Sequence, residues 1–224
     1  MQKNSELVLQ KGLLEERLLS EACSFIVGVD EVGRGCLAGP VYAAAVLLDY
    51  NAFQLLDPKT KALIRDSKTL SYKQRSSLEG LLLEISISAA IGVSPVDEIE
   101  NFGILKATFI AMQRAVDQVS NSSKIDILLL DGNQKLPSFK GKQQSIVGGD
   151  NLCYCISAAS ILAKQARDHF MQQQADIFPN YGFEQHVGYG TKLHLDMLTK
   201  YGITPLHRRN FAPVKRLLNE QQQI

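Results

Sequence analysis

Two adjacent carboxylates, Asp30 and Glu31, follow a short apolar run that begins at Phe25, and they precede the glycine-flanked arginine of Gly33-Arg34-Gly35. The run is rich in β-branched residues, a pattern typical of a buried strand. Charges at the end of such a strand are costly unless a cation compensates them. Glycines let the backbone approach a ligand that a Cβ atom would exclude. These residues indicate a metal site beside a phosphate-bearing substrate; the alternative is a strand end with ordinary ion pairs and a simple turn.

Two further acids follow apolar strand patterns. Residues 125–130 run into Asp131, and residues 145–147 lead through two glycines to Asp150. Magnesium and similar hard cations prefer oxygen ligands, and two such ions about 4 Å apart would activate a water and stabilise the leaving oxygen of a phosphodiester. Neighbours on a strand point to opposite faces, so Asp30 and Glu31 converge only if the strand ends there, as we expect. Asp150 has a second interpretation as a helix N-cap, which is compatible with metal binding.

The elements that must position these acids alternate between strands and helices. An amphipathic helix within 4–23 is expected to lead into the first strand, 25–31, with 41–48 as its antiparallel partner. Further strands are predicted over 85–93, 125–130 and 145–147, and helices over 71–83, 97–119, 153–174, 192–201 and from 213 onward. This alternation predicts an α/β sandwich. We divide the chain into a helical lead-in (1–24), a catalytic α/β domain (25–177) and a small helical, substrate-contacting cap (178–224).

Composition narrows the class of protein. The chain has 224 residues, of which 45% are hydrophobic, and a formal net charge of +1, so a phosphate-binding surface must come from clustered rather than overall charge. No stretch is apolar for long enough to span a bilayer, and the N-terminus lacks the apolar core of a secretory signal. The four cysteines have no zinc-like spacing. We therefore expect reduced thiols and a cytoplasmic location.

Taken in order along the chain, several motifs resemble those of the ribonuclease HII family, over residues from about 26 to 216. They are Asp30-Glu31-Val32-Gly33-Arg34-Gly35, Asp66-Ser67-Lys68, Leu130-Asp131-Gly132-Asn133, residues 157–164 ending in Lys164, Arg167-Asp168, Tyr181-Gly182-Phe183, His186, Gly188-Tyr189 and His207-Arg208-Arg209. The resemblance implies a ribonuclease H-like fold, with a mixed sheet flanked by helices.

The same resemblance implies an activity. Such an enzyme hydrolyses the RNA strand of RNA–DNA hybrids and cuts at single ribonucleotides in duplex DNA, with Mg²⁺ or Mn²⁺, leaving 3′-hydroxyl and 5′-phosphate ends. Asp30, Glu31, Asp131 and Asp150 match the catalytic, metal-binding acids. The 33–35 loop matches the contact to the ribonucleotide 2′-hydroxyl, which distinguishes RNA from DNA. Tyr189 matches the tyrosine that packs on the following sugar, and Ser67, Lys68, Lys164 and Arg208 are further substrate contacts. A monomer is expected.

Other interpretations accompany these assignments. Tyr189 is also compatible with an ordinary half-buried aromatic residue. Lys68 and Lys164 are compatible with solvated charges, and Arg208-Arg209 is compatible with a solvated basic pair. A non-catalytic RNA-binding module would not need four acids that repel phosphate, whereas a DNA nuclease or resolvase on the same fold would cut all-DNA substrates. The chain departs from the family where lysine is common, at Gly148 and Val187, and where proline is common, at Cys36. These departures concern the grip on substrate rather than the chemistry.

Overall fold

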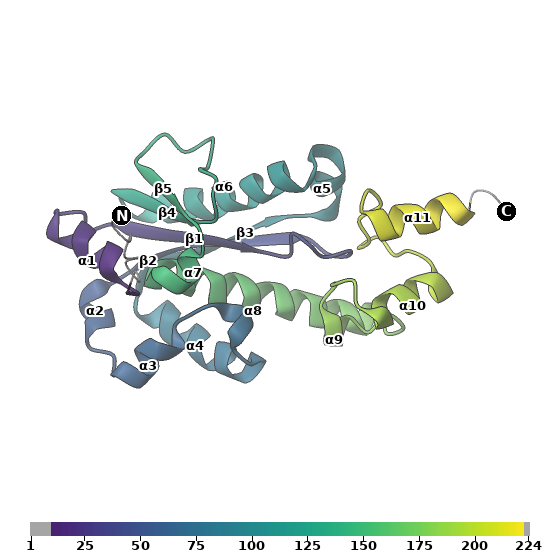
Figure 1. The fold of residues 1–224 in the computed structure, drawn as a ribbon, viewed down its shortest axis with the longest axis horizontal. Coiled ribbons are helices and arrows are strands. Elements are labelled where there is room, and N and C mark those ends of the chain that lie inside the picture. Colours follow the sequence, from purple (N-terminus) through teal and green to yellow (C-terminus); the bar gives the residue numbers. More distant parts are fainter. Residues whose placement is uncertain (1–9, 222–224) are drawn as a thin grey trace, which may run out of the picture.

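The computed structural model describes residues 10–221 and builds them around a five-stranded sheet with the order β3-β2-β1-β4-β5 (Figure 1). The strands are β1 (Ile26–Val32), β2 (Val41–Leu48), β3 (Ser86–Ser94), β4 (Ile127–Asp131) and β5 (Gln143–Ile146). β2 is antiparallel to β1 and β3, while β4 is parallel to β1 and β5. The sheet is therefore mixed, and the predicted fold class is confirmed.

Helices cover both faces of the sheet (Figure 1). α5 (Val96–Phe102) and α6 (Ile104–Ser122) lie on one face, where α6 packs through Ala107, Ala111 and Ala115 on the strands. α8 (Tyr154–Ile177) crosses the other face beside α4 (Tyr72–Glu84). Each face thus has its own hydrophobic core, and the carboxyl ends of β1 and β4 lie between them.

Glycine lets α8 approach the sheet closely. A Cβ on Gly28 of β1 would lie 2.2 Å from the main-chain carbon of Cys155, near the start of α8. The small side chains of Ser157, Ala158 and Ala159 continue this close contact and are fully buried. The long helix is thereby held against β1, the strand that carries the first two acids.

The remaining helices are short. They are α1 (Leu13–Ser20), α2 (Tyr50–Gln54), α3 (Pro58–Leu63), the 3₁₀ turn η1 (Ser67–Thr69), α7 (Gly149–Leu152), α9 (Phe183–His186), α10 (Lys192–Tyr201) and α11 (Ala212–Gln221). α9, α10 and α11 lie together at one end of the molecule, beyond the end of α8 (Figure 1). Ser71 caps α4 through a capping box with Gln74, as its place in the sequence predicts.

Two expectations were wrong in detail, and a third is only partly described. The first strand does not end at Glu31 but continues to Val32, because Glu31 still pairs with Ala43 of β2. The helix expected over 97–119 is divided into α5 and α6 by Gly103, whose φ of 78° interrupts the helical path. The N-terminal helix is described only as α1; residues 4–9 of the expected helix lie outside the described residues.

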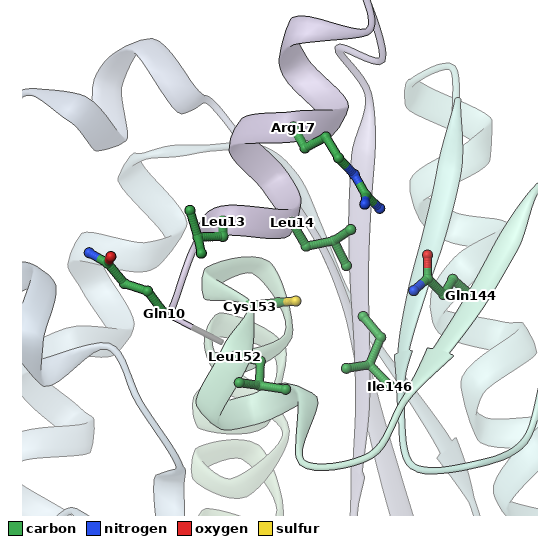
Figure 2. A pocket seen from close by; sticks show the side chains of 8 residues that line it. All are labelled: Gln10, Leu13, Leu14, Arg17, Gln144, Ile146, Leu152 and Cys153. Atoms are coloured by element: carbon green, nitrogen blue, oxygen red, sulfur yellow. The ribbon is translucent and has the colours of Figure 1, made fainter. Parts of the chain in front are cut away.

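One mostly apolar hollow of about 510 Å³ lies between α1, β5 and α7 (Figure 2). It is lined by Gln10, Leu13, Leu14, Arg17, Gln144, Ile146, Leu152 and Cys153, and by none of the predicted site residues. Within residues 10–221 no helix combines the length and the apolar character needed to cross a membrane.

Candidate active site

Asp30 and Asp131 lie on the same face of the sheet, at the ends of neighbouring parallel strands. Val29 of β1 is in register with Leu130 of β4, so each aspartate is the next residue along its strand. Side chains alternate along a strand, and the neighbours Val27 and Val29 face α6; Asp30 therefore faces α8. Asp30 is buried, with only 6% of its surface exposed, and the Ser160 hydroxyl of α8 interacts with its carboxylate.

Asp150 is brought to this pair by the short helix α7. The main-chain N–H of Gly149 donates to Oδ1 of Asp131 at 2.7 Å, which fixes the start of α7 against the end of β4. Asp150, the next residue, is itself buried. A Cβ on Gly149 would lie 3.3 Å from the same Asp131 oxygen, so a glycine suits this close approach. A specific hydrogen bond therefore links the residue before Asp150 to Asp131, the acid at the end of β4.

Glu31 belongs to the same group of charges but not to the same face. Because β1 continues through it, Glu31 alternates away from Asp30. Arg34 lies 3.1 Å from one Glu31 carboxylate oxygen, within the glycine-flanked loop. The side chain of Arg34 is 49% exposed, so this ion pair is accessible to a ligand. Substrate bound at the loop would meet Glu31 and Arg34 together.

Burial and neighbouring charges raise the pKa of Asp30, Glu31 and Asp150. Burial, followed by the charges of Glu31 and Asp131, holds the pKa of Asp30 well above its ordinary value. Burial and the Asp131 charge also raise the pKa of Glu31, against the opposing effect of Arg34. Burial and Asp131 likewise raise the pKa of Asp150. Asp131 is thus the charge that the other three acids share, and a cation bound here would relieve the repulsion.

Among residues 10–221, no three His, Cys, Asp or Glu side chains converge closely enough to form a ready-made metal site. The four acids interact through their charges without meeting at one point. Like charges keep such groups apart, and a bound cation is what would draw them together. All the ligands on offer are carboxylate oxygens, which suits Mg²⁺ or Mn²⁺ and does not suit zinc. The donor chemistry therefore fits the predicted metals.

Positive charge lies beside the acids. Burial acts to lower the pKa of Lys68, but Asp66, Asp30 and Asp150 outweigh it and raise the pKa above its ordinary value. Lys164 is buried in α8 and donates to Oδ1 of Asp168 at 2.7 Å. Lys68 is exposed. Lys68 is therefore available to a phosphate directly, whereas Lys164 is partly neutralised by its own helix.

Lys68 and Lys164 line a cleft of about 580 Å³ together with Val187 and Tyr189. Tyr189 is 37% exposed, and the Lys164 ammonium lies 5.6 Å from the centre of its ring. Val187 adopts a left-handed backbone conformation, with φ 42°, which is unusual for a β-branched residue. An open cleft that carries an exposed lysine and an aromatic ring suits a nucleic-acid strand.

Arg208 is placed inside the protein rather than on its surface. Its side chain is fully buried, and its guanidinium donates to the carbonyl oxygens of Gly33, Arg34 and Gly39 at 2.7–2.9 Å. Direct contact with substrate is the prediction for Arg208, and it does not fit this burial, because the loop's carbonyl oxygens occupy the guanidinium donors. Arg209, its neighbour, is exposed.

Ser67 is also buried. Its hydroxyl lies 2.9 Å from the hydroxyl of Ser160, the residue that interacts with Asp30. Its carbonyl oxygen accepts from Arg75 at 3.2 Å. Ser67 is therefore linked to Asp30 through Ser160.

Gly35, in the loop after β1, has open space around its Cα, because a Cβ added there would meet nothing within 4 Å.

Several residues of the site escaped sequence reasoning. Arg167 is fully buried and donates to the carbonyl oxygens of Ala38, Pro40 and Val187, which ties the loop after β1 to the cleft. Arg75 donates to Asp168 at 2.9 Å and so completes a buried chain of charges with Lys164. The motif Arg167-Asp168 was part of the resemblance and was the only sequence signal for these contacts.

The chain is similar in sequence to known proteins. The sequence model of the family Ribonuclease HII matches residues 27–214. A Ribonuclease HII of Synechococcus sp. (strain CC9902) is 46% identical over 195 residues, covering 87% of this chain and 94% of that protein. A Ribonuclease HII of Sphingopyxis alaskensis is 47% identical over 199 residues, covering 89% of this chain and 94% of that protein.

Solved structures share the fold at lower sequence identity. The ribonuclease H2 of Pyrococcus horikoshii superposes with a TM-score of 0.71 and 20% identity, covering 89% of this chain and 99% of that chain. Bst-RNase HIII in complex with Mn²⁺ superposes with a TM-score of 0.68 and 17% identity, covering 90% of this chain and 71% of that chain.

Proposed function

This chain belongs to the ribonuclease HII family, and from this premise we propose that it is a metal-dependent endonuclease acting on RNA–DNA hybrids and on single ribonucleotides in duplex DNA. Its products would carry 5′-phosphate and 3′-hydroxyl ends. The main support is the arrangement of the acids: Asp30 and Asp131 follow registered residues of two parallel strands, and Gly149 joins Asp150 to Asp131.

Asp30, Asp131, Asp150 and Glu31 would hold Mg²⁺ or Mn²⁺. When bound, the metal supplies an activated water and stabilises the leaving oxygen of the phosphodiester. The protein contributes the mutual repulsion of its carboxylates, which favours cation binding, and the hydrogen bond from Gly149 that keeps one Asp131 oxygen fixed. The close packing of α8 on β1 places Ser160 on the Asp30 side of the sheet, where its hydroxyl acts to lower the pKa of Asp30.

The substrate would lie across the cleft beside these acids. Lys68 would contact a phosphate, and Arg34 and the open backbone at Gly35 would face the ribose 2′-hydroxyl. Arg208 and Arg167 would hold the loop after β1 in place from inside the protein, because both guanidinium groups donate to its carbonyl oxygens. Tyr189 would pack on the sugar that follows the ribonucleotide.

The test is a cleavage experiment on three matched duplexes that share one sequence. One strand is end-labelled and contains a single ribonucleotide, a continuous RNA stretch, or DNA only. Each duplex is incubated with Mg²⁺, with Mn²⁺ or with a chelator, and the cut is mapped. A phosphatase-sensitive 5′ end and a 3′ end that a polymerase can extend would identify the product ends.

The proposal predicts metal-dependent cutting of the first two duplexes and none of the all-DNA duplex. Equal cutting of the all-DNA duplex would instead favour a DNA nuclease on the same fold. Binding without cutting in either metal would favour a nucleic-acid-binding module, and cutting in the chelator would contradict the role given to the acids.

A further inference from the structure

Three buried histidines lie together in the cap formed by α9, α10 and the segment before α11. The rings of His186 and His194 stack with centroids 4.3 Å apart, and His194 and His207 approach through their Nε2 atoms at 3.1 Å. All three side chains are at most 6% exposed. None of the three histidines lies among the four acids, so the proposed metal chemistry does not require them.

The hydrogen bonds fix which ring nitrogen carries the proton in His194 and in His207. The main-chain N–H of Thr204 donates to Nδ1 of His207 at 2.8 Å, so this nitrogen is bare and the proton of the neutral ring is on Nε2. That Nε2–H meets Nε2 of His194, which must therefore accept. The remaining proton of His194 is on Nδ1, and it donates to the carbonyl oxygen of Tyr189 at 2.9 Å.

Burial supports the neutral forms that this chain of hydrogen bonds requires. Burial, followed by the neighbouring histidines, lowers the pKa of both His194 and His207 to about 4. A second proton on either ring would also place two N–H groups face to face. The order of donors is therefore fixed from Thr204 through both rings to Tyr189.

This chain of hydrogen bonds ends at Tyr189, a residue that lines the proposed substrate cleft. The carbonyl oxygen of Tyr189 accepts from His194 and from the main-chain N–H of Thr191 at 2.8 Å. The preceding residue is held as well: the N–H of Gly188 donates to Nδ1 of His186 at 3.2 Å. These hydrogen bonds lie behind the backbone, while the Tyr189 ring is exposed in the cleft.

We propose that His194 and His207 are positioning residues, which fix the main chain of Tyr189 through a directed pair of imidazole hydrogen bonds and thereby set how well the enzyme selects the RNA–DNA junction. This inference rests on the proposed function, because it needs Tyr189 to contact the sugar at the junction. It assigns a role in specificity to two rings that lie behind the substrate-facing surface.

Two substitutions at one position separate hydrogen bonding from packing. His194→Phe keeps an aromatic ring against His186 but removes both ring nitrogens. His194→Asn removes the ring but keeps an amide N–H near the place of Nδ1, from which it can donate to Tyr189. A role in packing alone would favour phenylalanine, whereas the directed hydrogen bond favours asparagine.

The measured quantity is the ratio of cleavage rate on the single-ribonucleotide duplex to that on the long hybrid. We expect His194→Phe, which loses the hydrogen bonds to both Tyr189 and His207, to lower this ratio by about tenfold. His194→Asn loses the acceptor for His207 but keeps a donor to Tyr189, so we expect it to lower the ratio by only about threefold. An unchanged ratio in His194→Phe, or an equal loss in both variants, would overturn the proposal. Failure of the proposed function is distinct, because the unsubstituted enzyme would then cut neither substrate.

A second measurement needs no variant. Nitrogen chemical shifts of the imidazole rings in the ¹⁵N-labelled full chain identify the tautomer of each histidine near neutral pH. The proposal predicts Nδ1–H for His194 and Nε2–H for His207. The opposite tautomer at His194 would overturn it, since the carbonyl oxygen of Tyr189 would then face a bare nitrogen.

Discussion

The ammonium of Lys11 lies 3.1 Å from the main-chain oxygen of Asp150, although 139 positions separate the two residues in the sequence. Lys11 also donates to the hydroxyl of Ser157, which itself donates to the same Asp150 oxygen at 2.6 Å. Next to it, the N–H of Gly12 donates to the carbonyl oxygen of Leu152 at 2.9 Å. The segment before α1 therefore holds the short helix that carries one of the four acids.

Replacing Lys11 with methionine should weaken metal binding, because the chain around Asp150 loses a charged donor. Partners that orient metal ligands typically change affinity by 10–100-fold, and we expect about tenfold here because Lys11 contacts the main chain of Asp150 rather than its carboxylate. Calorimetric titration with Mn²⁺ measures the effect without reference to activity. Lys59→Met, at an exposed position on α3, is the matched control. An affinity equal to that of the control would show that Lys11 does not position Asp150.

Tyr189→Ala should reduce cutting at an RNA–DNA junction more than cutting inside a long hybrid, since only the junction presents the deoxyribose on which the ring is proposed to pack. Tyr189→Phe keeps the ring and should keep the selectivity. Rates on both substrates, measured for the two variants side by side, decide the matter. Equal losses on both substrates in Tyr189→Ala would make the ring a structural element only.

Val187→Lys should tighten substrate binding at low salt. Val187 lines the cleft beside Tyr189, and its left-handed φ of 42° suits an unbranched side chain better than valine. One added phosphate contact steepens the salt dependence of binding by about 0.9 on duplex DNA. Binding is measured across a salt series with calcium in place of the catalytic metal. Val187→Gln relieves the same backbone strain without charge, so parallel lines for the two variants would mean that position 187 does not face phosphate.

Acid should destabilise the cap through its histidines. The pKa of His194 and of His207 is lowered to about 4 in the folded chain, against about 6.5 when unfolded. A lowered pKa means that the unfolded chain takes up protons first, so this stability is intact above pH 6.5 and is lost as the pH falls toward 4. The buried acids, whose pKa values are raised, act in the opposite direction.

A variant isolates the histidine contribution. Between pH 6.5 and pH 4, the unfolding free energy of the parent should fall further than that of His207→Gln, by about 1–3 kcal/mol. His169→Gln, at an exposed position on α8, serves as the control. Urea unfolding at several pH values gives the comparison, and curves for the parent and His207→Gln that keep a constant separation would refute the prediction.

Local patterns explain why much of the fold could be predicted. The apolar run before Asp30 and the alternation after Ile85 predict strands because burial of one or both faces dictates residue type. The capping residue Ser71 marks the start of α4 in the sequence itself. Three acids were assigned to the ends of strands, and Asp131 is indeed the last residue of β4.

Long-range contacts explain what could not be predicted. Arg208 and Arg209 are adjacent and chemically alike, yet only Arg208 is buried, because the carbonyl oxygens that receive it come from a loop about 170 positions earlier. Lys11 gives no local sign that it contacts Asp150. The continuation of β1 through Glu31 depends on pairing with Ala43 of β2. The glycines that follow Glu31 indicate a turn in the sequence, so they give no sign of this pairing.

The most direct test of the account is the cleavage rate of Asp131→Asn in Mn²⁺, because the Asp131 charge raises the pKa of the other three acids. Asparagine can still accept the N–H of Gly149, so the fold should persist, with a melting temperature at or above that of the parent once the repulsion is relieved. Asp117→Asn, at an exposed position on α6, is the matched control. We predict that Asp131→Asn lowers the rate on the single-ribonucleotide duplex by at least about a hundredfold, the scale on which loss of an essential charged group acts, and that it also loses the rise in melting temperature that Mn²⁺ gives the parent. Cleavage by folded Asp131→Asn at a rate close to that of Asp117→Asn would contradict the account.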